Sequence, residues 1–435
     1  MSVTTTDNLT GQIVSAVQQK INVKADPLRN EALQIFQELG LPAPKHEEYK
    51  HTPIARYLEK NFSFAASPAS GPLADIKRFF IPGVDANVIV MIDGVFSQAH
   101  SRVISPETEI KIQSLGEALA AKNPVATQHF AKYLDIRNNS LAAWNTAAWN
   151  QGIFIHVPDN KVVETPVIIY YISNATAGEN IVVNRNLIVA GKNSQATVVE
   201  KFDSTGSANH FTNLVTEVFV DENAGLDLYS IQHDLNNRFQ HNITEIFQKN
   251  SSRVNTFTFT LQGKFFRNNL HLALDGEGIE SHMYGLYLLN SDTLADNHTV
   301  VDHKKPNSFS NELYKGIMDE SSKGIFNGKI FVRPNAQKTN AFQANRNILL
   351  TDKATVNTKP QLEIWADDVK CSHGCTTGQL DEEALFYLQS RGINKDTARA
   401  MMLYAFAGEV LDYVKHPQLK DYLDSVISDR LHKNF

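Results

Sequence analysis

The stretch IVVNRNLIVAG at residues 181–191 decides the fold that the sequence predicts. It is short, rich in β-branched residues and followed closely by a turn at Asn193–Ser194, which is the pattern of a β-strand. Comparable β-rich runs dominate from about residue 140 to about 370. Between them, turns that end in a small residue recur at spacings of 30, 27, 27, 30 and 28 residues; they are Asn193–Ser194, Asn223–Ala224, Asn250–Ser251, Glu277–Gly278, Asn307–Ser308 and Asn335–Ala336.

This periodicity separates two β architectures. Asn tolerates the left-handed backbone conformation, and a small neighbour lets successive turns stack closely. A fixed period of 27–30 residues with little helix favours a β-solenoid, in which each coil stacks on the one before it. The alternative is a β-sandwich built from hairpins. We therefore expect a mainly β fold, and the period favours the solenoid.

Helical patterns flank the β-rich part, so three regions are expected. Residues 1–135 form a helical and mixed N-terminal region, 136–378 the β region and 379–435 a C-terminal helical domain. Asp381 is the expected N-cap of the first C-terminal helix. Apolar stripes mark one N-terminal helix and the last two C-terminal helices. Their members are Leu33, Phe36 and Leu39; Ala398, Met402, Phe406, Val410 and Val414; and Leu419, Leu423, Val426 and Ile427.

The composition excludes several classes of function. There are 41 Lys and Arg residues against 47 Asp and Glu, a net charge of −6, so nucleic acid and anionic membranes are poor candidates for partners. The longest apolar runs fall far short of the roughly 18 residues of a membrane span. No GxxxxGK[ST] phosphate loop occurs, so ATP hydrolysis is not expected. Two cysteines in 435 residues fit a reducing compartment, which predicts a cytoplasmic location.

Both cysteines lie in VKCSHGCTTG, residues 369–378. On a strand, Cys371, His373 and Cys375 point to one face, roughly 7 Å apart. One straight strand therefore cannot wrap a zinc ion, and a Cys371–Cys375 disulfide would need a sharp turn. A thiolate nucleophile would need an oxyanion element that the sequence does not reveal. Two interpretations stay open: half of a metal site that another chain completes, or two buried small residues beside a core histidine.

Two other histidine groups are weaker candidates. His46 and His51 are five residues apart, which rotates the second away from the face that a zinc-binding HExxH helix requires. A surface charge cluster is expected there. In ADNHTVVDHKKP, residues 295–306, His298 and His303 face opposite sides of a strand. Together with Asp296 and Asp302 they are expected to be structural.

Three stretches carry a resemblance to a known family. KPQLEIWADDVKCSHGC at 359–375 belongs to a segment, about 296–414, that strongly resembles the SufD family, the scaffold subunits of the SufB–SufC–SufD iron–sulfur cluster assembly machine. NTAAWNQGIFIHVPDNKVVETPVIIYY at 145–171 is similar to the entry into the family's β-helix. LPAPKHEEYKHTP at 41–53 resembles the family's N-terminal pattern, with Tyr49 where the family usually has Trp. The matching residues of that pattern are Lys45, Glu47, Lys50 and Thr52.

The resemblance implies a right-handed parallel β-helix and a scaffold rather than an enzyme. It makes His373 a metal ligand at the interface with SufB, beside Cys371 of the C-S-H-G motif, while Cys375, usually Ala in the family, is a possible further ligand. Asn345 and Gly374 stand where SufB has cluster ligands. The cofactor implied is a transient iron–sulfur cluster at the interface, with none expected in the isolated chain.

The resemblance also implies partners. SufB is expected at an exposed solenoid edge, with a homodimer when the chain is made alone. The SufC ATPase is expected to dock on the C-terminal helices, with Phe406, Val410, Leu411 and Val414 as candidate contacts. Two other classes compete: a β-helix carbohydrate-active enzyme, which needs clustered carboxylates in a groove, and a structural zinc-binding domain centred on 371–375.

Overall fold

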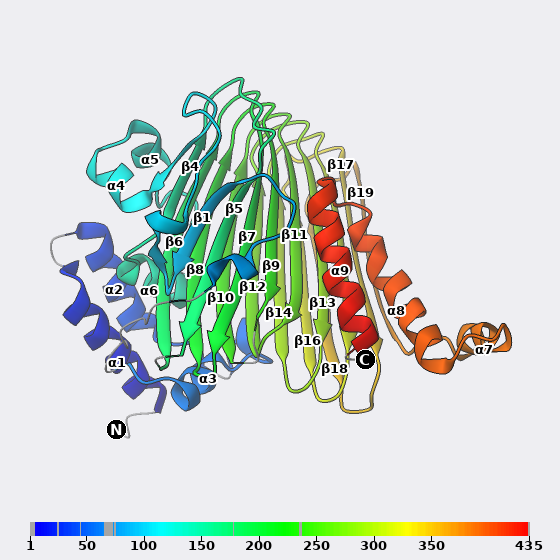
Figure 1. Ribbon diagram of the computed structural model, residues 1–435. Helices are drawn as coiled ribbons and strands as arrows, with labels where there is room; N and C mark the ends of the chain where they lie inside the picture. Colours follow the sequence, from blue (N-terminus) through cyan, green and yellow to red (C-terminus); the bar gives the residue numbers. More distant parts are fainter. Residues whose placement is uncertain are drawn as a thin grey trace.

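A computed structural model of the chain describes residues 5–23, 26–43, 45–64, 73, 75–176, 178–234 and 237–433. From Ile153 to Gly378 the chain forms a parallel β-solenoid (Figure 1). Successive strands alternate between two sheets, so each strand pairs in parallel with the strand two positions further along the chain. The predicted solenoid is thus confirmed, and the β-sandwich alternative is wrong.

The two sheets stack in chain order. Sheet A contains β1 Asn87–Ile92, β2 Val95–Phe96, β5 Val167–Ala175, β7 Gln195–Gly206, β9 Gly225–His233, β11 Arg253–Gln262, β13 Glu280–Leu289, β15 Phe309–Met318, β17 Thr339–Leu349 and β19 Val369–Gly378. Sheet B contains β3 Lys111–Ser114, β4 Ile153–Val157, β6 Asn180–Ala190, β8 His210–Val220, β10 Arg238–Gln248, β12 Phe265–Leu274, β14 Leu294–His303, β16 Lys323–Val332 and β18 Thr355–Ile364.

The first strands come from the region that was predicted to be a mixed N-terminal part. β1 pairs in parallel with β5 and carries β2 as an antiparallel edge. β3 pairs antiparallel with β4. Residues 87–114 therefore begin both sheets, because their short apolar runs find pairing partners on the first coil rather than among the helices.

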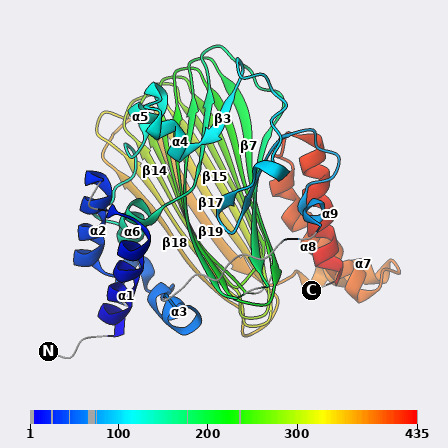
Figure 2. The same cartoon turned by 60° about the vertical axis from the view of Figure 1, so that its left-hand side comes forward.

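Helices cover the two outer faces of the solenoid (Figure 2). The N-terminal helices are α1 Thr5–Lys20, α2 Pro27–Leu39, α3 Ile54–Asn61, α4 Leu115–Ala120, α5 Pro124–His129 and α6 Ser140–Ala148, with short 3₁₀ turns at Glu47–Tyr49, Ile76–Phe79 and Gln98–His100. Apolar side chains of α1, α2, α3 and α6 pack with the outer face of sheet B. Leu33 and Phe36 are buried there as predicted, whereas Leu39 is 47% exposed.

The C-terminal helices α7 Glu382–Ser390, α8 Lys395–Leu411 and α9 Pro417–Lys433 follow β19, and α8 and α9 pack on the outer face of sheet A. Asp381 caps α7 as predicted, accepting hydrogen bonds from two backbone N–H groups. The buried face of α8 is rotated from the predicted stripe: Met402 and Phe406 are only partly buried. The fully buried side chains are Ala398, Ala400, Leu403, Ala407, Val410 and Leu411. Among the described residues, no helix is long and apolar enough to span a membrane.

The corner turns explain the sequence period. Asn193, Asn223 and Asn307 adopt left-handed backbone with φ of 55°, 57° and 63°, as the pattern predicted. In the turn at Asn250–Ser251 the left-handed residue is Ser251 instead, and after Asn335–Ala336 it is Lys338. The side chains also stack: Asn223 Nδ2 donates to Asn193 Oδ1 at 2.8 Å, and Asn193 Nδ2 donates to Asn160 Oδ1 at 2.8 Å.

Replacing Asn193 by Ala should lower the free energy of unfolding by about 1–2 kcal/mol, because alanine is strained in the left-handed region and the amide ladder is broken. Asn193→Gly is the matched control, since glycine keeps the backbone conformation and loses only the ladder. Chemical denaturation of both variants separates the two contributions. Equal stability of Asn193→Ala and the parent chain would contradict this account of the turn.

Candidate functional site

The two sheets end together at the C-terminal end of the solenoid. β19 is the last strand of sheet A and pairs only with β17 among the described strands, and β18 is the last strand of sheet B and pairs only with β16. The outward backbone groups of both strands therefore lack a strand partner within this part of the chain. Such an edge is a template for pairing with another chain.

β19 places the three predicted side chains on one face. Their register neighbours on β17 are Ala341, Gln343 and Asn345. Cys371, His373 and Cys375 therefore lie on the face of β19 that is directed toward the solenoid interior, at its open end. His373 and Cys375 are exposed. Both cysteines carry free thiols. The interpretation of two buried cysteines beside a core histidine is therefore wrong, because no further coil of the described residues covers this end.

Cys371 differs from its two neighbours. It is partly buried and packs against a small apolar cluster that includes Ala341 and Ala366. Burial raises the pKa of the Cys371 thiol. A raised pKa keeps this thiol protonated unless a metal ion displaces the proton.

Cys375 contacts the opposite sheet. Its Sγ lies 2.9 Å from the Thr358 hydroxyl on β18 and 3.9 Å from Asn345 Oδ1. Asn345 in turn donates to the Tyr287 hydroxyl at 3.0 Å, and Tyr287 donates to Asn347 Oδ1 at 2.5 Å. Burial raises the pKa of Tyr287, so this phenol stays a donor. A hydrogen-bonded polar interior therefore begins directly behind the thiol.

A buried carboxyl lies behind His373, and the sequence pattern did not reveal it. Gln343, the register neighbour of His373, donates to Glu312 at 2.7 Å. Burial raises the pKa of Glu312 to about 7. The alternation of inward and outward side chains along β15 could have placed Glu312 on the inner face. Only the register between β15, β17 and β19 shows that Glu312 lies in line with His373.

The donors at this end do not by themselves make up a metal site within the described residues. Among the residues that the structure describes, no group of three or more His, Cys, Asp or Glu side chains could hold a metal ion. A structural zinc ion needs about four closely arranged ligands, which 371–375 do not supply. A Cβ built on Gly374 would meet nothing within 4 Å, so the space over the strand is open. The arrangement can offer His373 and Cys371 to a metal whose other ligands come from elsewhere.

The other predicted histidines behave as expected. On β14, Asp296 and His298 lie on the outer face of sheet B, where His298 Nε2 is 3.0 Å from Asp296 Oδ1. His303 lies on the inner face and pairs with the Ser310 hydroxyl at 2.9 Å. His46 and His51 are exposed. The prediction that His298 and His303 face opposite sides is confirmed.

The four candidate contacts for the ATPase lie on or after α8, and three of them are buried within this chain. Val410, Leu411 and Val414 pack in the cluster between the C-terminal helices and sheet A. Leu411 is 2% exposed, although the predicted apolar stripe of this helix did not include it. Beside them, Lys315 of β15 donates to the Phe406 carbonyl at 2.7 Å. These side chains hold the helices to the solenoid, so their role in docking stays a prediction.

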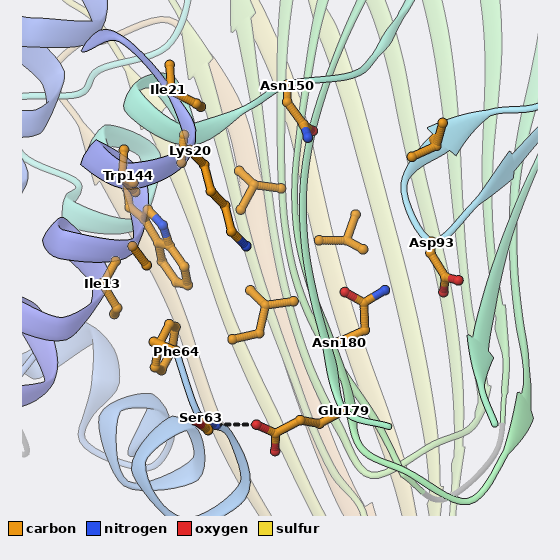
Figure 3. A pocket seen from close by; sticks show the side chains of 17 residues that line it. Ile13, Lys20, Ile21, Ser63, Phe64, Asp93, Trp144, Asn150, Glu179 and Asn180 are labelled. Carbon is orange, nitrogen blue, oxygen red and sulfur yellow. Dashed lines mark hydrogen bonds between the residues drawn. The ribbon is translucent and has the colours of Figure 1, made fainter. Parts of the chain in front are cut away.

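A cavity of about 390 Å³ lies at the other end of the solenoid, between α1, α6 and β6 (Figure 3). Ile13, Phe64 and Trp144 form its apolar side, and Asp93 and Asn180 lie opposite (Figure 3). Lys20 and Glu179 also line it. The cavity contains none of the predicted site residues, and its mixed charges select no ligand chemistry.

Comparison with known proteins agrees with the motifs. The family model described as "SUF system FeS cluster assembly, SufBD core domain" matches residues 171–406, and the model of the "SufBD protein N-terminal region" matches residues 9–169. These matches place the chain in a family of iron–sulfur cluster assembly proteins. The chain belongs to the SufBD family, which confirms the family resemblance found in the motifs.

Several relatives extend over nearly the whole chain. The iron–sulfur cluster assembly protein SufD of Escherichia coli is 32% identical over 413 residues, covering 94% of this chain and 93% of the relative. A SufBD family protein of Synechocystis is 31% identical, covering 92% and 90%. SufD of Bacillus subtilis is 27% identical, covering 93% of each.

Proposed function

We propose that this chain is a scaffold subunit that pairs with a SufB subunit through the open end of its solenoid. The pair then assembles an iron–sulfur cluster as cargo between the two chains. His373 supplies a neutral imidazole, which suits iron, and Cys371 supplies a thiolate once iron displaces its proton. The cluster is transient, and the chain alone holds none. We place the protein in the cytoplasm, as a homodimer when no SufB subunit is present.

The position of Cys371, His373 and Cys375 on the open edge strand β19, with His373 and Cys375 exposed and Cys371 partly buried, carries this proposal. An edge strand recruits a partner through its unpaired backbone groups. The same step would bring the partner's side chains to His373 and so complete the ligand set. The relatives described above, which are named as iron–sulfur cluster assembly proteins, support a role in cluster assembly.

Co-expression with SufB-type and SufC-type subunits tests the proposal. We expect the three chains to co-purify and to incorporate iron and sulfide under anaerobic conditions. Elution of this chain alone, from an extract in which the other two subunits remain associated, would overturn the scaffold assignment.

We further propose that the C-terminal helices dock the ATPase subunit. The most exposed large apolar side chains there are Phe386 at 72% and Tyr387 at 57%, both on α7, ahead of Met401 at 45% and Tyr413 at 41%. In Figure 1, α7 projects away from the solenoid. Aromatic side chains are enriched in the cores of protein interfaces, so this pair is the candidate contact.

Phe386→Glu should weaken binding of the ATPase subunit at least about ten-fold, because a charge replaces an exposed aromatic anchor. Folding should be unchanged, since the side chain packs little within this chain. Gln389→Glu, also exposed on α7, is the matched charge control and should bind normally. Calorimetry with the isolated ATPase subunit measures the affinity of both variants. Full affinity of a folded Phe386→Glu chain would show that the docking site does not include this face of α7.

A further inference from the structure

Residues 47–52 cross the outer face of sheet B and contact a series of its strands; we refer to them as the strap. The Tyr49 hydroxyl lies 3.5 Å from His241 Nε2 on β10, and the Arg267 guanidinium of β12 lies 4.4 Å from the centre of the Tyr49 ring. Thr52 donates to Asp296 on β14. The strap therefore runs across the stacked coils rather than along one of them.

Within the strap, Glu48 makes contacts with three strands of sheet B. Its carboxylate pairs with Lys329 of β16 at 2.7 Å and with His298 of β14 at 3.2 Å, and its backbone oxygen accepts from Arg267 Nη1 at 2.8 Å. The hydrogen bond from His298, aided by Lys329 and opposed by partial burial, holds the pKa of Glu48 well below its usual range. Arg267 and Asp296 beneath it are buried and paired at 2.5 Å. These ion pairs and hydrogen bonds join the strap to β12, β14 and β16.

The strap ends at the terminal coil. Glu47 forms an ion pair with Lys359 on β18, the strand that has only β16 as a partner among the described strands. β18 in turn reaches β19 through the contact between Thr358 and Cys375. A continuous set of contacts thus joins the N-terminal region to the strand that carries His373.

We propose that the strap is a positioning element that holds the terminal coil, β18 and β19, in the position in which its open edge is presented. Glu47 is the positioning residue at its outer end and acts through Lys359. The role of this edge in pairing and in holding the cluster rests on the proposed function. The mechanical role, holding the last coil, stands on the strap contacts alone.

Hydrogen–deuterium exchange of the full-length isolated chain tests the mechanical role. Glu47→Lys places two positive charges together, so amide exchange in residues 355–364 and 369–378 should rise about three- to five-fold, in line with the loss of one exposed ion pair. Exchange in the other strands and the thermal midpoint should stay unchanged. Glu59→Lys, on the exposed side of α3, makes the same charge change outside the strap and should leave the terminal coil as it was.

A variant in which the two charges are swapped provides the decisive test. The double variant Glu47→Lys/Lys359→Glu restores an attractive pair and should return exchange in the terminal coil to the level of the parent chain. Unchanged exchange in Glu47→Lys, or no recovery in the double variant, would overturn the proposal. Because this readout uses no partner, it can fail while the scaffold function holds, and it can succeed even if no SufB-type subunit binds.

Discussion

His373→Ala should reduce cluster assembly in the complex at least about ten-fold while leaving the chain folded and paired. Disturbing the surroundings of a metal ligand typically costs 10- to 100-fold in metal affinity or activity, and removing the ligand itself should cost no less. His373 is exposed on β19, so its removal leaves no buried group without a partner and no cavity in the core. The loss should therefore appear in iron and sulfide bound per complex, and not in the amount of complex.

Two variants control this experiment. His100→Ala removes another exposed imidazole, far from the terminal coil in the sequence, and should retain full cluster yield. Cys375→Ala restores the residue that is usual in the family and should also be nearly silent. A normal yield from a folded His373→Ala complex would refute the shared site. A Cys375→Ala complex without cluster would instead add this thiol to the ligands.

The site strand was predictable because its geometry is local. Alternation on a strand places Cys371, His373 and Cys375 on one face whatever surrounds them, and the structure keeps them there. Their exposure was not predictable. It depends on β19 being the last strand of sheet A, which the spacing of residues within the motif does not encode.

The contacts of the strap were outside the reach of pattern reasoning for a different reason. Glu48 and Lys329 are 281 residues apart in the sequence, and nothing local indicates that a short 3₁₀ turn lies across sheet B. The sequence could mark residues 41–53 only through their resemblance to the family. The physical role of Glu48, as the carboxylate between Lys329 and His298, required the fold.

The C-terminal helices show a third kind of limit. Apolar residues occur on several sides of α8, so the predicted stripe through Met402 and Phe406 was one of several similar choices. Sheet A selects a neighbouring face, because Lys315 and Arg346 of β15 and β17 both pair with Glu409. Those ion pairs agree with the observed rotation of the helix, in which Leu403, Ala407 and Leu411 are the buried residues.

The interior of the solenoid depends on glycine–tyrosine pairs in neighbouring coils. Gly285 lies beside Tyr314, and Gly316 lies beside Tyr287. A Cβ built on Gly316 would lie 2.2 Å from Cε2 of Tyr287 and 2.7 Å from Oδ1 of Asn347. Each ring therefore occupies the space that a side chain on the neighbouring strand would need. These glycines are required for close approach and not for an unusual backbone conformation.

Gly316→Ala should consequently lower the free energy of unfolding by about 2–4 kcal/mol. Overpacking a rigid interior costs about 1–3 kcal/mol, and a displaced Tyr287 would also lose its hydrogen bonds with Asn345 and Asn347, which are buried. Gly378→Ala in β19 is the matched control, because a Cβ there meets nothing within 4 Å, and its stability should be close to that of the parent chain.

A second-site change identifies the cause. Tyr287→Leu removes the ring and hydroxyl that oppose the new methyl group, so Gly316→Ala should cost less in that background than in the parent chain, and the difference measures the direct coupling of the pair. Denaturant titration of the four chains gives the cycle. Additive effects, or a Gly316→Ala chain as stable as its parent, would show that the coils can separate to admit a side chain.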